Sequence, residues 1–179
     1  MNIRHCFGHG TAVADLHSTD KYDALRELIH GAPVFQEIDG LDEFAAAVVD
    51  REKIQTTGLG HGVAVAHGRV QGVRRVLIAL GVSRRGIRYE SPDGEQVRLL
   101  FVIASPPHVT LDYLQALSTL VRGLRRQPVR DSLLAAADAE EIEARIRSAY
   151  CAELERLTEP AAGRKICGAA PIRRSASAG

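Results

Sequence analysis

The stretch from residue 51 to residue 69 reads REKIQTTGLGHGVAVAHGR. It begins at the end of an amphipathic helix and continues over residues 56–62 as Thr-Thr-Gly-Leu-Gly-His-Gly, a glycine density that no packed helix tolerates. A turn with free backbone amides uses glycine in this way. Residues 62–66 follow as a short apolar strand that ends on His67. The sequence therefore predicts a helix, a shaped glycine loop and a strand with a histidine at its end.

Two helices are predicted upstream of this stretch. Ser18 can cap a helix over residues 20–30, whose apolar side chains fall on one face and which Gly31 ends. In residues 41–51 the apolar side chains repeat at i, i+3, i+4, i+7 and i+8, the pattern of an amphipathic helix. A short strand over residues 11–16 precedes both helices.

The strands downstream read as buried. Residues 76–82 and 97–104 are apolar runs too continuous for a half-exposed sheet, so both faces of these strands should be covered. Between them Ser91-Pro92-Asp93-Gly94 has strong turn chemistry, which predicts an antiparallel hairpin. The sheet is then mixed.

The last third of the sequence is predicted to be helical. A leucine-rich helix covers residues 111–124, Pro128 suits the first turn of a shorter helix, and Asp138 with Glu141 resembles a capping box that opens the last one. The fold class is therefore α/β, with a single mixed β-sheet flanked by helices on both faces and a helical C-terminal third. Residues 1–157 are expected to form one domain, and residues 158–179, which lack periodicity, a flexible C-terminal tail.

Composition limits the classes of partner. The 179 residues carry 23 basic and 22 acidic side chains, a net charge of +1 that gathers neither nucleic acid nor an anionic membrane. The cluster Arg122, Arg125, Arg126 and Arg130 is a solvated face or part of a docking surface. Three widely spaced cysteines fit a reducing cytoplasm, and no apolar run reaches membrane-spanning length, so direct membrane insertion is not expected.

His67 is the candidate nucleophile. Neutral imidazole is nucleophilic near physiological pH because its unperturbed pKa is about 6.5. A phosphoryl group that arrives on its nitrogen needs alignment and charge stabilisation, since the transition state is loose and anionic. The groups that can stabilise this charge if the loop folds back over His67 are the Thr57 hydroxyl, the amides around Gly58, Gly60 and Gly62, the imidazole of His61, and the cations Arg51 and Arg69.

Each of these candidates also has a structural interpretation. Arg51 ends a helix, where the dipole favours a cation whatever its function. Thr57 can close the turn through its hydroxyl, and the glycines can serve backbone geometry alone. His61 is either a phosphate-facing donor or an exposed loop residue. Because His61 and His67 lack a third ligand at metal-binding spacing, neither a metal nor an organic cofactor is expected.

The same residues carry a family resemblance. Arg-Glu-Lys followed by Thr-Thr-Gly-Leu-Gly-His-Gly-Val-Ala-Val-Ala-His-Gly resembles the phosphorylation-site signature of enzyme IIA components of the phosphoenolpyruvate-dependent sugar phosphotransferase system, of the fructose, mannitol and nitrogen-regulatory type. The similarity extends in order and spacing over about residues 11–152. It implies a phosphotransferase system enzyme IIA component that is phosphorylated on His67. It also implies a histidine-containing phosphocarrier protein as donor, and an enzyme IIB or a regulatory protein as acceptor.

Two positions depart from the family pattern. Ala66 stands where the family usually has proline, and Tyr113 stands where many members have a second histidine. The chain is too short to include an enzyme IIB domain, which favours a stand-alone nitrogen-regulatory subunit. The alternatives are a sugar-specific transporter subunit of the fructose or mannitol type and a regulatory module that acts by contact alone.

Overall fold

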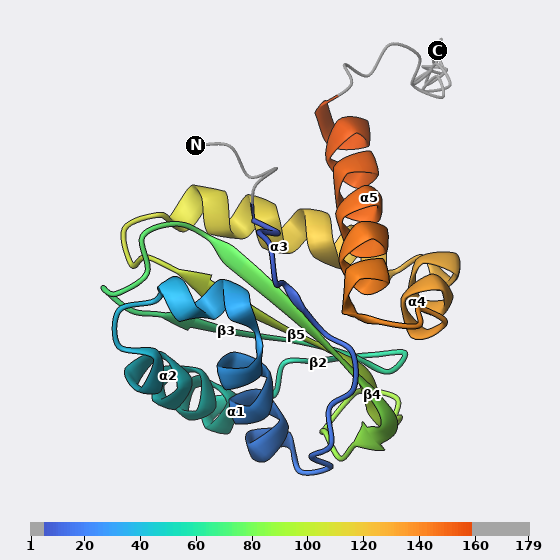
Figure 1. Cartoon of the computed structure of the whole chain (residues 1–179), viewed down its shortest axis with the longest axis horizontal. Helices are drawn as coiled ribbons and strands as arrows, with labels where there is room; N and C mark the ends of the chain where they lie inside the picture. The colour runs from blue at the N-terminus through green and yellow to red at the C-terminus, as the bar shows by residue number, and fades with distance from the viewer. Residues whose placement is uncertain (1–5, 159–179) are drawn as a thin grey trace, which may run out of the picture.

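The sheet has five strands in the order β1-β4-β5-β3-β2 in the computed structural model, which describes residues 6–158 (Figure 1). The strands are β1 (Ala12–Val13), β2 (Gly58–Gly60), β3 (Val63–Arg69), β4 (Leu77–Ile87) and β5 (Val97–Ser105). β4 and β5 form the predicted antiparallel hairpin, while β3 runs parallel to β5 and β1 parallel to β4. The predicted mixed sheet is confirmed.

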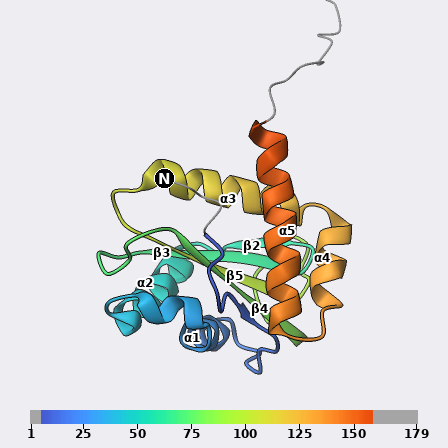
Figure 2. The same ribbon diagram turned by 45° about the horizontal axis from the view of Figure 1, so that its top comes forward.

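Helices cover both faces of the sheet. On one face lie α1 (Lys21–Gly31), the 3-10 helix η2 (Pro33–Glu37) and α2 (Leu41–Ile54), and on the other lie α3 (Thr110–Leu124), α4 (Gln127–Leu134) and α5 (Ala139–Thr158). Figure 2 shows α3 above the sheet and α1 and α2 below it. Each face buries its own apolar cluster against these helices. The predicted helix-flanked sheet and helical C-terminal third are therefore confirmed.

The side chains of β3 divide between the two apolar clusters. Ala64 and Ala66 belong to the cluster under α1 and α2, whereas Val63 and Val65 belong to the cluster under α3 and α5. Since side chains alternate along a strand, His67 points to the α3 side of the sheet and Gly68 to the α2 side. A Cβ on Gly68 would lie 2.7 Å from Val48 Cγ2. Gly68 therefore lets α2 pack against the strand.

Several local predictions were corrected. The glycine stretch is not a free loop, because Gly58–Gly60 pairs antiparallel with β3 as strand β2. β3 does not end on His67 but continues to Arg69. α1 is capped by Asp20 instead of Ser18, since the Asp20 carboxylate accepts hydrogen bonds from the backbone N–H groups of Tyr22 and Asp23.

The C-terminal part follows the prediction closely. Pro128 lies in the first turn of α4, and Asp138 Oδ1 accepts the Glu141 N–H at 2.8 Å at the start of α5. α5 continues to Thr158, and the rest of the predicted tail, residues 159–179, lies outside the described residues. None of the helices within residues 6–158 is both long and apolar enough to cross a bilayer.

Candidate functional site

His67 lies in β3 with its half-buried ring directed toward the first turn of α3. The nearest aromatic ring is that of Tyr113, whose centroid is 5.6 Å from that of His67 and whose plane is tilted by 43°. Tyr113 itself is only 4% exposed. The strand and the helix therefore fix two rings against each other at the surface of the sheet.

Two arginines flank this pair of rings. Arg51, in the last turn of α2, donates from Nη1 to the Gln55 carbonyl at 3.1 Å. The Arg69 guanidinium carbon lies 4.5 Å above the centre of the Tyr113 ring. Burial, followed by the charges of Arg51 and Arg69, lowers the pKa of His67 below its ordinary value. The imidazole is consequently neutral at physiological pH.

This arrangement is suited to receiving an anionic electrophile. A neutral imidazole has one nitrogen lone pair free for attack, and it needs no prior deprotonation. The two guanidinium groups carry positive charge at any physiological pH. Cations held beside a nucleophile stabilise negative charge that develops on the transferred group. The geometry therefore combines a neutral imidazole with neighbouring positive charge.

A buried polar network supports the segment that carries Arg51. The neighbouring Glu52 is only 1% exposed and accepts hydrogen bonds from Thr57, at 3.1 Å from the backbone N–H and 2.6 Å from the hydroxyl. The Thr57 hydroxyl is also 3.0 Å from the Tyr89 hydroxyl, and Lys21 Nζ lies 3.8 Å from the Glu52 carboxylate. These contacts fix the turn between α2 and β2. The Thr57 hydroxyl is thus directed at Glu52, in agreement with its structural interpretation.

Glu52 was not predicted as a site residue from the sequence, although its position in α2 carries a signal. Glu52 follows Val48 by four residues and Val49 by three, so it continues the buried stripe of α2. A carboxylate on the apolar stripe of an amphipathic helix indicates a buried partner.

The rest of the glycine stretch is not brought to His67. Gly58 pairs with Ala64 and Gly60 with Val63, so the turn Gly60-His61-Gly62 lies at the opposite end of β3 from His67. His67 is the fourth residue after Val63 in the strand, which corresponds to a distance of about 13 Å. All three turn residues have positive φ, and the His61 N–H donates to Asp93 Oδ2 at 2.6 Å. These residues serve the hairpin, and the expectation that they fold back over His67 is corrected.

The comparisons with known proteins agree with this geometry. The family model of the phosphoenolpyruvate-dependent sugar phosphotransferase system, EIIA 2, matches residues 7–149. The chain belongs to this family. It is a IIA domain, and its family supports a role as a carrier in phosphoryl transfer.

Relatives of this IIA domain include regulatory and sugar-specific proteins. It is 36% identical over 124 residues to the nitrogen regulatory protein of Bradyrhizobium diazoefficiens, an alignment that covers 68% of this chain and 79% of that protein. It is 30% identical over 142 residues to the fructose-specific EIIABC component of Bacillus subtilis, covering 79% of this chain but only 22% of that protein. Among solved structures, the nitrogen regulatory protein IIA-Ntr from Neisseria meningitidis matches with a TM-score of 0.73 and 28% identity, covering 80% and 98% of the two chains.

Three large apolar side chains are exposed on the helices that carry Arg51 and Tyr113 in this IIA domain. Ile54, at the end of α2, is 81% exposed, and Leu111 and Leu114, in the first turns of α3, are 82% and 50% exposed. Ile54 follows Arg51 by one helical turn, and the two leucines flank Tyr113 in the sequence. We call these three residues the apolar rim. Large apolar side chains that are exposed to water are typical of a protein-docking surface where they form one patch.

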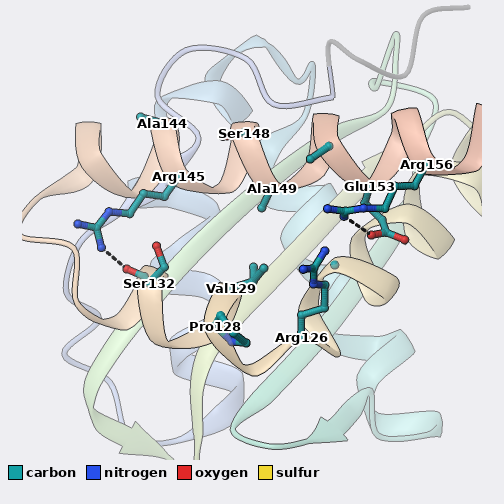
Figure 3. A pocket seen from close by; sticks show the side chains of 12 residues that line it. Arg126, Pro128, Val129, Ser132, Ala144, Arg145, Ser148, Ala149, Glu153 and Arg156 are labelled. Atoms are coloured by element: carbon teal, nitrogen blue, oxygen red, sulfur yellow. Dashed lines mark hydrogen bonds and ion pairs between the residues drawn. The ribbon is translucent and has the colours of Figure 1, made fainter.

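The IIA domain also has a groove that is separate from His67. A groove of about 500 Å³ lies between α5, α4 and the end of α3, and Figure 3 shows the side chains that line it. Its Arg145 is hydrogen-bonded to the Ser132 carbonyl and paired with Glu141, and its Arg156 is paired with Glu153 at 3.0 Å. Since the groove meets α3 at Gly123, far from Tyr113 in the first turn, it is not part of the histidine site.

The buried Cys6 is not a second centre of this kind. Burial raises the pKa of the Cys6 thiol to about 11, so this thiol is not a nucleophile near neutral pH. Within residues 6–158, no group of three or more His, Cys, Asp or Glu side chains is placed to hold a metal ion.

Proposed function

We propose that His67 accepts a phosphoryl group from a histidine-containing phosphocarrier protein and passes it on or signals by carrying it. The supporting observation is the neutral, half-exposed imidazole of His67 with Arg51 and Arg69 beside it. In the acceptance step the donor's N–P bond breaks as the N–P bond to His67 forms, and the donor nitrogen keeps the electron pair. The two arginines stabilise the charge on the equatorial phosphoryl oxygens during this step.

Arg51 and Arg69 are the phosphoryl-stabilising residues of this proposal. Thr57 and Gly58 contribute indirectly, since their segment connects Arg51 to the sheet and is fixed by Glu52. Gly60, His61 and Gly62 have no part in it, because the β2–β3 turn lies about 13 Å from the histidine along the strand.

The apolar rim is the proposed docking surface for the donor and the acceptor. Both must bring a reacting atom to within bonding distance of one imidazole, and Ile54, Leu111 and Leu114 are exposed for contact on the helices that carry Arg51 and Tyr113. Successive use of one surface by two partners fits a surface of modest size. The acceptor is an enzyme IIB or a regulatory protein.

The nitrogen-regulatory type is the better supported of the two subtypes. The regulatory protein of B. diazoefficiens shares 36% identity with this chain, against 30% for the fructose-specific protein. Such a subunit works in the cytoplasm, where its donor is formed. The observation that separates the subtypes is transfer of the label to the cysteine of an enzyme IIB, which a sugar-specific subunit performs and a purely regulatory one does not.

Transfer of labelled phosphate from phosphoenolpyruvate to this protein, through enzyme I and the phosphocarrier protein, tests the proposal. The protein is incubated with labelled phosphoenolpyruvate, enzyme I and the phosphocarrier protein, and acid-labile label on the chain is measured. We expect label on the wild type and none on His67→Ala. The matched control is His61→Asn, because asparagine tolerates the positive φ of 54° at this position and should retain full labelling.

Two outcomes would contradict the proposal. Label that persists on His67→Ala would place the phosphoryl group elsewhere. A wild type that never takes the label but still binds the phosphocarrier protein would support the contact-only module.

A further inference from the structure

Tyr113 lies between the two side chains of β3 that flank Gly68. Its ring centroid is 5.6 Å from that of His67, and the Arg69 guanidinium carbon is 4.5 Å from the same ring centre. His67 and Arg69 are two residues apart in one strand, so both project toward α3. One aromatic ring therefore contacts both the nucleophile and one of the two cations.

The Tyr113 ring is a fixed platform, whereas no charged group among residues 6–158 holds Arg69. Tyr113 is 4% exposed and belongs to the apolar cluster between α3 and the sheet. Arg69 is exposed, and in the part of the chain that the structure describes no carboxylate forms an ion pair with it. A guanidinium that stacks on an aromatic face is attracted by the negative charge of the ring's π-system. Stacking on Tyr113 is thus the interaction that keeps this flexible side chain near the histidine.

We propose that Tyr113 is a positioning residue, whose ring holds the Arg69 guanidinium so that Arg69 and Arg51 together stabilise the phosphoryl group on His67. The inference rests on the proposed function for the reaction itself. Tyr113 forms no bond to the phosphoryl group in this scheme and acts through Arg69.

The electrostatics of the two rings support this placement. Burial, followed by the charges of Arg51 and Arg69, lowers the pKa of His67, and the same two charges oppose the rise that burial causes in the pKa of Tyr113. Both cations are therefore close to both rings. If Arg69 moved into solvent, water would screen its charge and His67 would retain only Arg51.

The ring and the hydroxyl of Tyr113 lead to different expectations. If the ring acts by stacking, Tyr113→Phe keeps the effect and Tyr113→Leu loses it. If the hydroxyl donates to the phosphoryl group, Tyr113→Phe loses as much as Tyr113→Leu. The structure favours the ring, because the contact with Arg69 is made by the aromatic face.

The first measurement is the NMR titration of the His67 imidazole in unphosphorylated protein. We expect Tyr113→Leu and Arg69→Gln to raise the pH midpoint of His67, and Tyr113→Phe to leave it unchanged. This measurement needs no phosphoryl transfer. It therefore decides the placement of Arg69 even if the wild type is never phosphorylated, an outcome that would refute the proposed function alone.

The second measurement is the kinetics of phosphoryl transfer from the phosphocarrier protein. We expect Tyr113→Leu to lower kcat by about two- to fivefold, the range for one exposed cation–π contact, with KM nearly unchanged. Arg69→Gln should lower kcat at least as much, and the double variant should be no slower than Arg69→Gln, because Tyr113 acts through Arg69.

Three results would overturn the inference. These are a loss in Tyr113→Phe equal to that in Tyr113→Leu, effects of Tyr113→Leu and Arg69→Gln that multiply in the double variant, and an unchanged His67 midpoint in Arg69→Gln. Arg69 is exposed, so Arg69→Gln keeps the test decisive if Tyr113→Leu does not fold.

Discussion

The carboxylate of Glu52 accepts two hydrogen bonds from Thr57, one from the backbone N–H at 3.1 Å and one from the hydroxyl at 2.6 Å. Glu52 is buried near the end of α2, and Thr57 immediately precedes β2. The pair therefore connects the helix that carries Arg51 to the sheet that carries His67. A buried carboxylate that loses a donor keeps its desolvation cost, so this connection should be sensitive to small changes.

Removing the Thr57 hydroxyl should destabilise the protein. Thr57→Val keeps the shape of the side chain but leaves the Glu52 carboxylate one hydrogen bond short, and we expect the free energy of unfolding to fall by about 1–3 kcal/mol. Urea denaturation followed by circular dichroism measures the change. Thr57→Ser retains the hydroxyl and should lose much less. Equal losses in the two variants would show that the methyl group matters and the hydrogen bond does not.

Adding a methyl group at Gly68 should disturb the packing of α2. The new Cβ would lie 2.7 Å from Val48 Cγ2 and 2.9 Å from Phe44 Cε2, so Gly68→Ala should destabilise by about 1–3 kcal/mol. The double variant Gly68→Ala/Val48→Ala should be more stable than Gly68→Ala alone, because it lacks the clashing Val48 Cγ2 atom. As a control, Gly123→Ala in α3 meets nothing within 4 Å and should be neutral or stabilising. Thermal unfolding of the four proteins checks both expectations.

The rate of phosphoryl acceptance should depend on the pKa of His67. Because burial and the charges of Arg51 and Arg69 lower this pKa, the reactive neutral form persists below the ordinary midpoint of about pH 6.5. The labelling rate of the wild type should therefore stay high down to a pH below 6.5. Arg51→Gln removes one of the charges, which should raise the pKa of His67 and shift the acidic limb of the pH profile to higher pH. An unmoved limb would mean that Arg51 does not act on the imidazole.

The ion pair between His30 and Asp42 should contribute to stability only at acidic pH. His30 Nε2 lies 2.9 Å from Asp42 Oδ1, and this contact, with the Arg26 carbonyl, raises the pKa of His30. A raised pKa in the folded state gives a contribution that is complete below the unfolded value of about 6.5 and lost as the pH rises through the folded value. The pair is exposed, so the contribution should be at most about 1 kcal/mol. Asp42→Asn should be less stable than wild type at pH 5.5 and equal to it at pH 8.5, as measured by urea denaturation.

The apolar rim should affect binding of the donor more than the chemical step. Leu111→Ser removes an 82% exposed side chain, and we expect KM for the phosphocarrier protein to rise by about three- to tenfold with kcat preserved. Leu59→Ser provides the control, because Leu59 is 43% exposed but belongs to β2, at the far end of β3 from His67. A rise in KM of the same size in both variants would argue against a local docking surface.

Much of the fold follows from periodicity in the sequence. The helical repeat over residues 41–51, the turn chemistry of Ser91-Pro92-Asp93-Gly94 and the apolar runs of β4 and β5 specify elements that the structure contains. Each of these features depends on neighbouring residues or on the apolar character of a segment. Both can be read directly from the sequence. The glycine stretch was interpreted wrongly because glycine indicates backbone freedom, and a strand beside a positive-φ turn uses that freedom as readily as a phosphate-binding loop does.

The site was predictable only in part, for a physical reason. The motif predicts His67 as the phosphorylated residue and Arg51 as a phosphoryl-stabilising cation, roles that belong to the proposed function. The contact of Tyr113 with His67 joins segments that are far apart in the sequence and depends on where α3 begins beside β3. No local pattern encodes that distance.

Small and large side chains alternate in β3, so the position of a residue along the strand decides which face of the sheet its side chain occupies. Ala64, Ala66 and Gly68 occupy one side, while Val63, Val65 and His67 occupy the other. Inserting or deleting a single residue between Val63 and His67 would turn the imidazole toward α2 and place it where only a hydrogen atom fits. Substitutions in this strand can therefore reduce stability by small steps. Insertion or deletion of one residue should instead abolish folding and phosphoryl acceptance together.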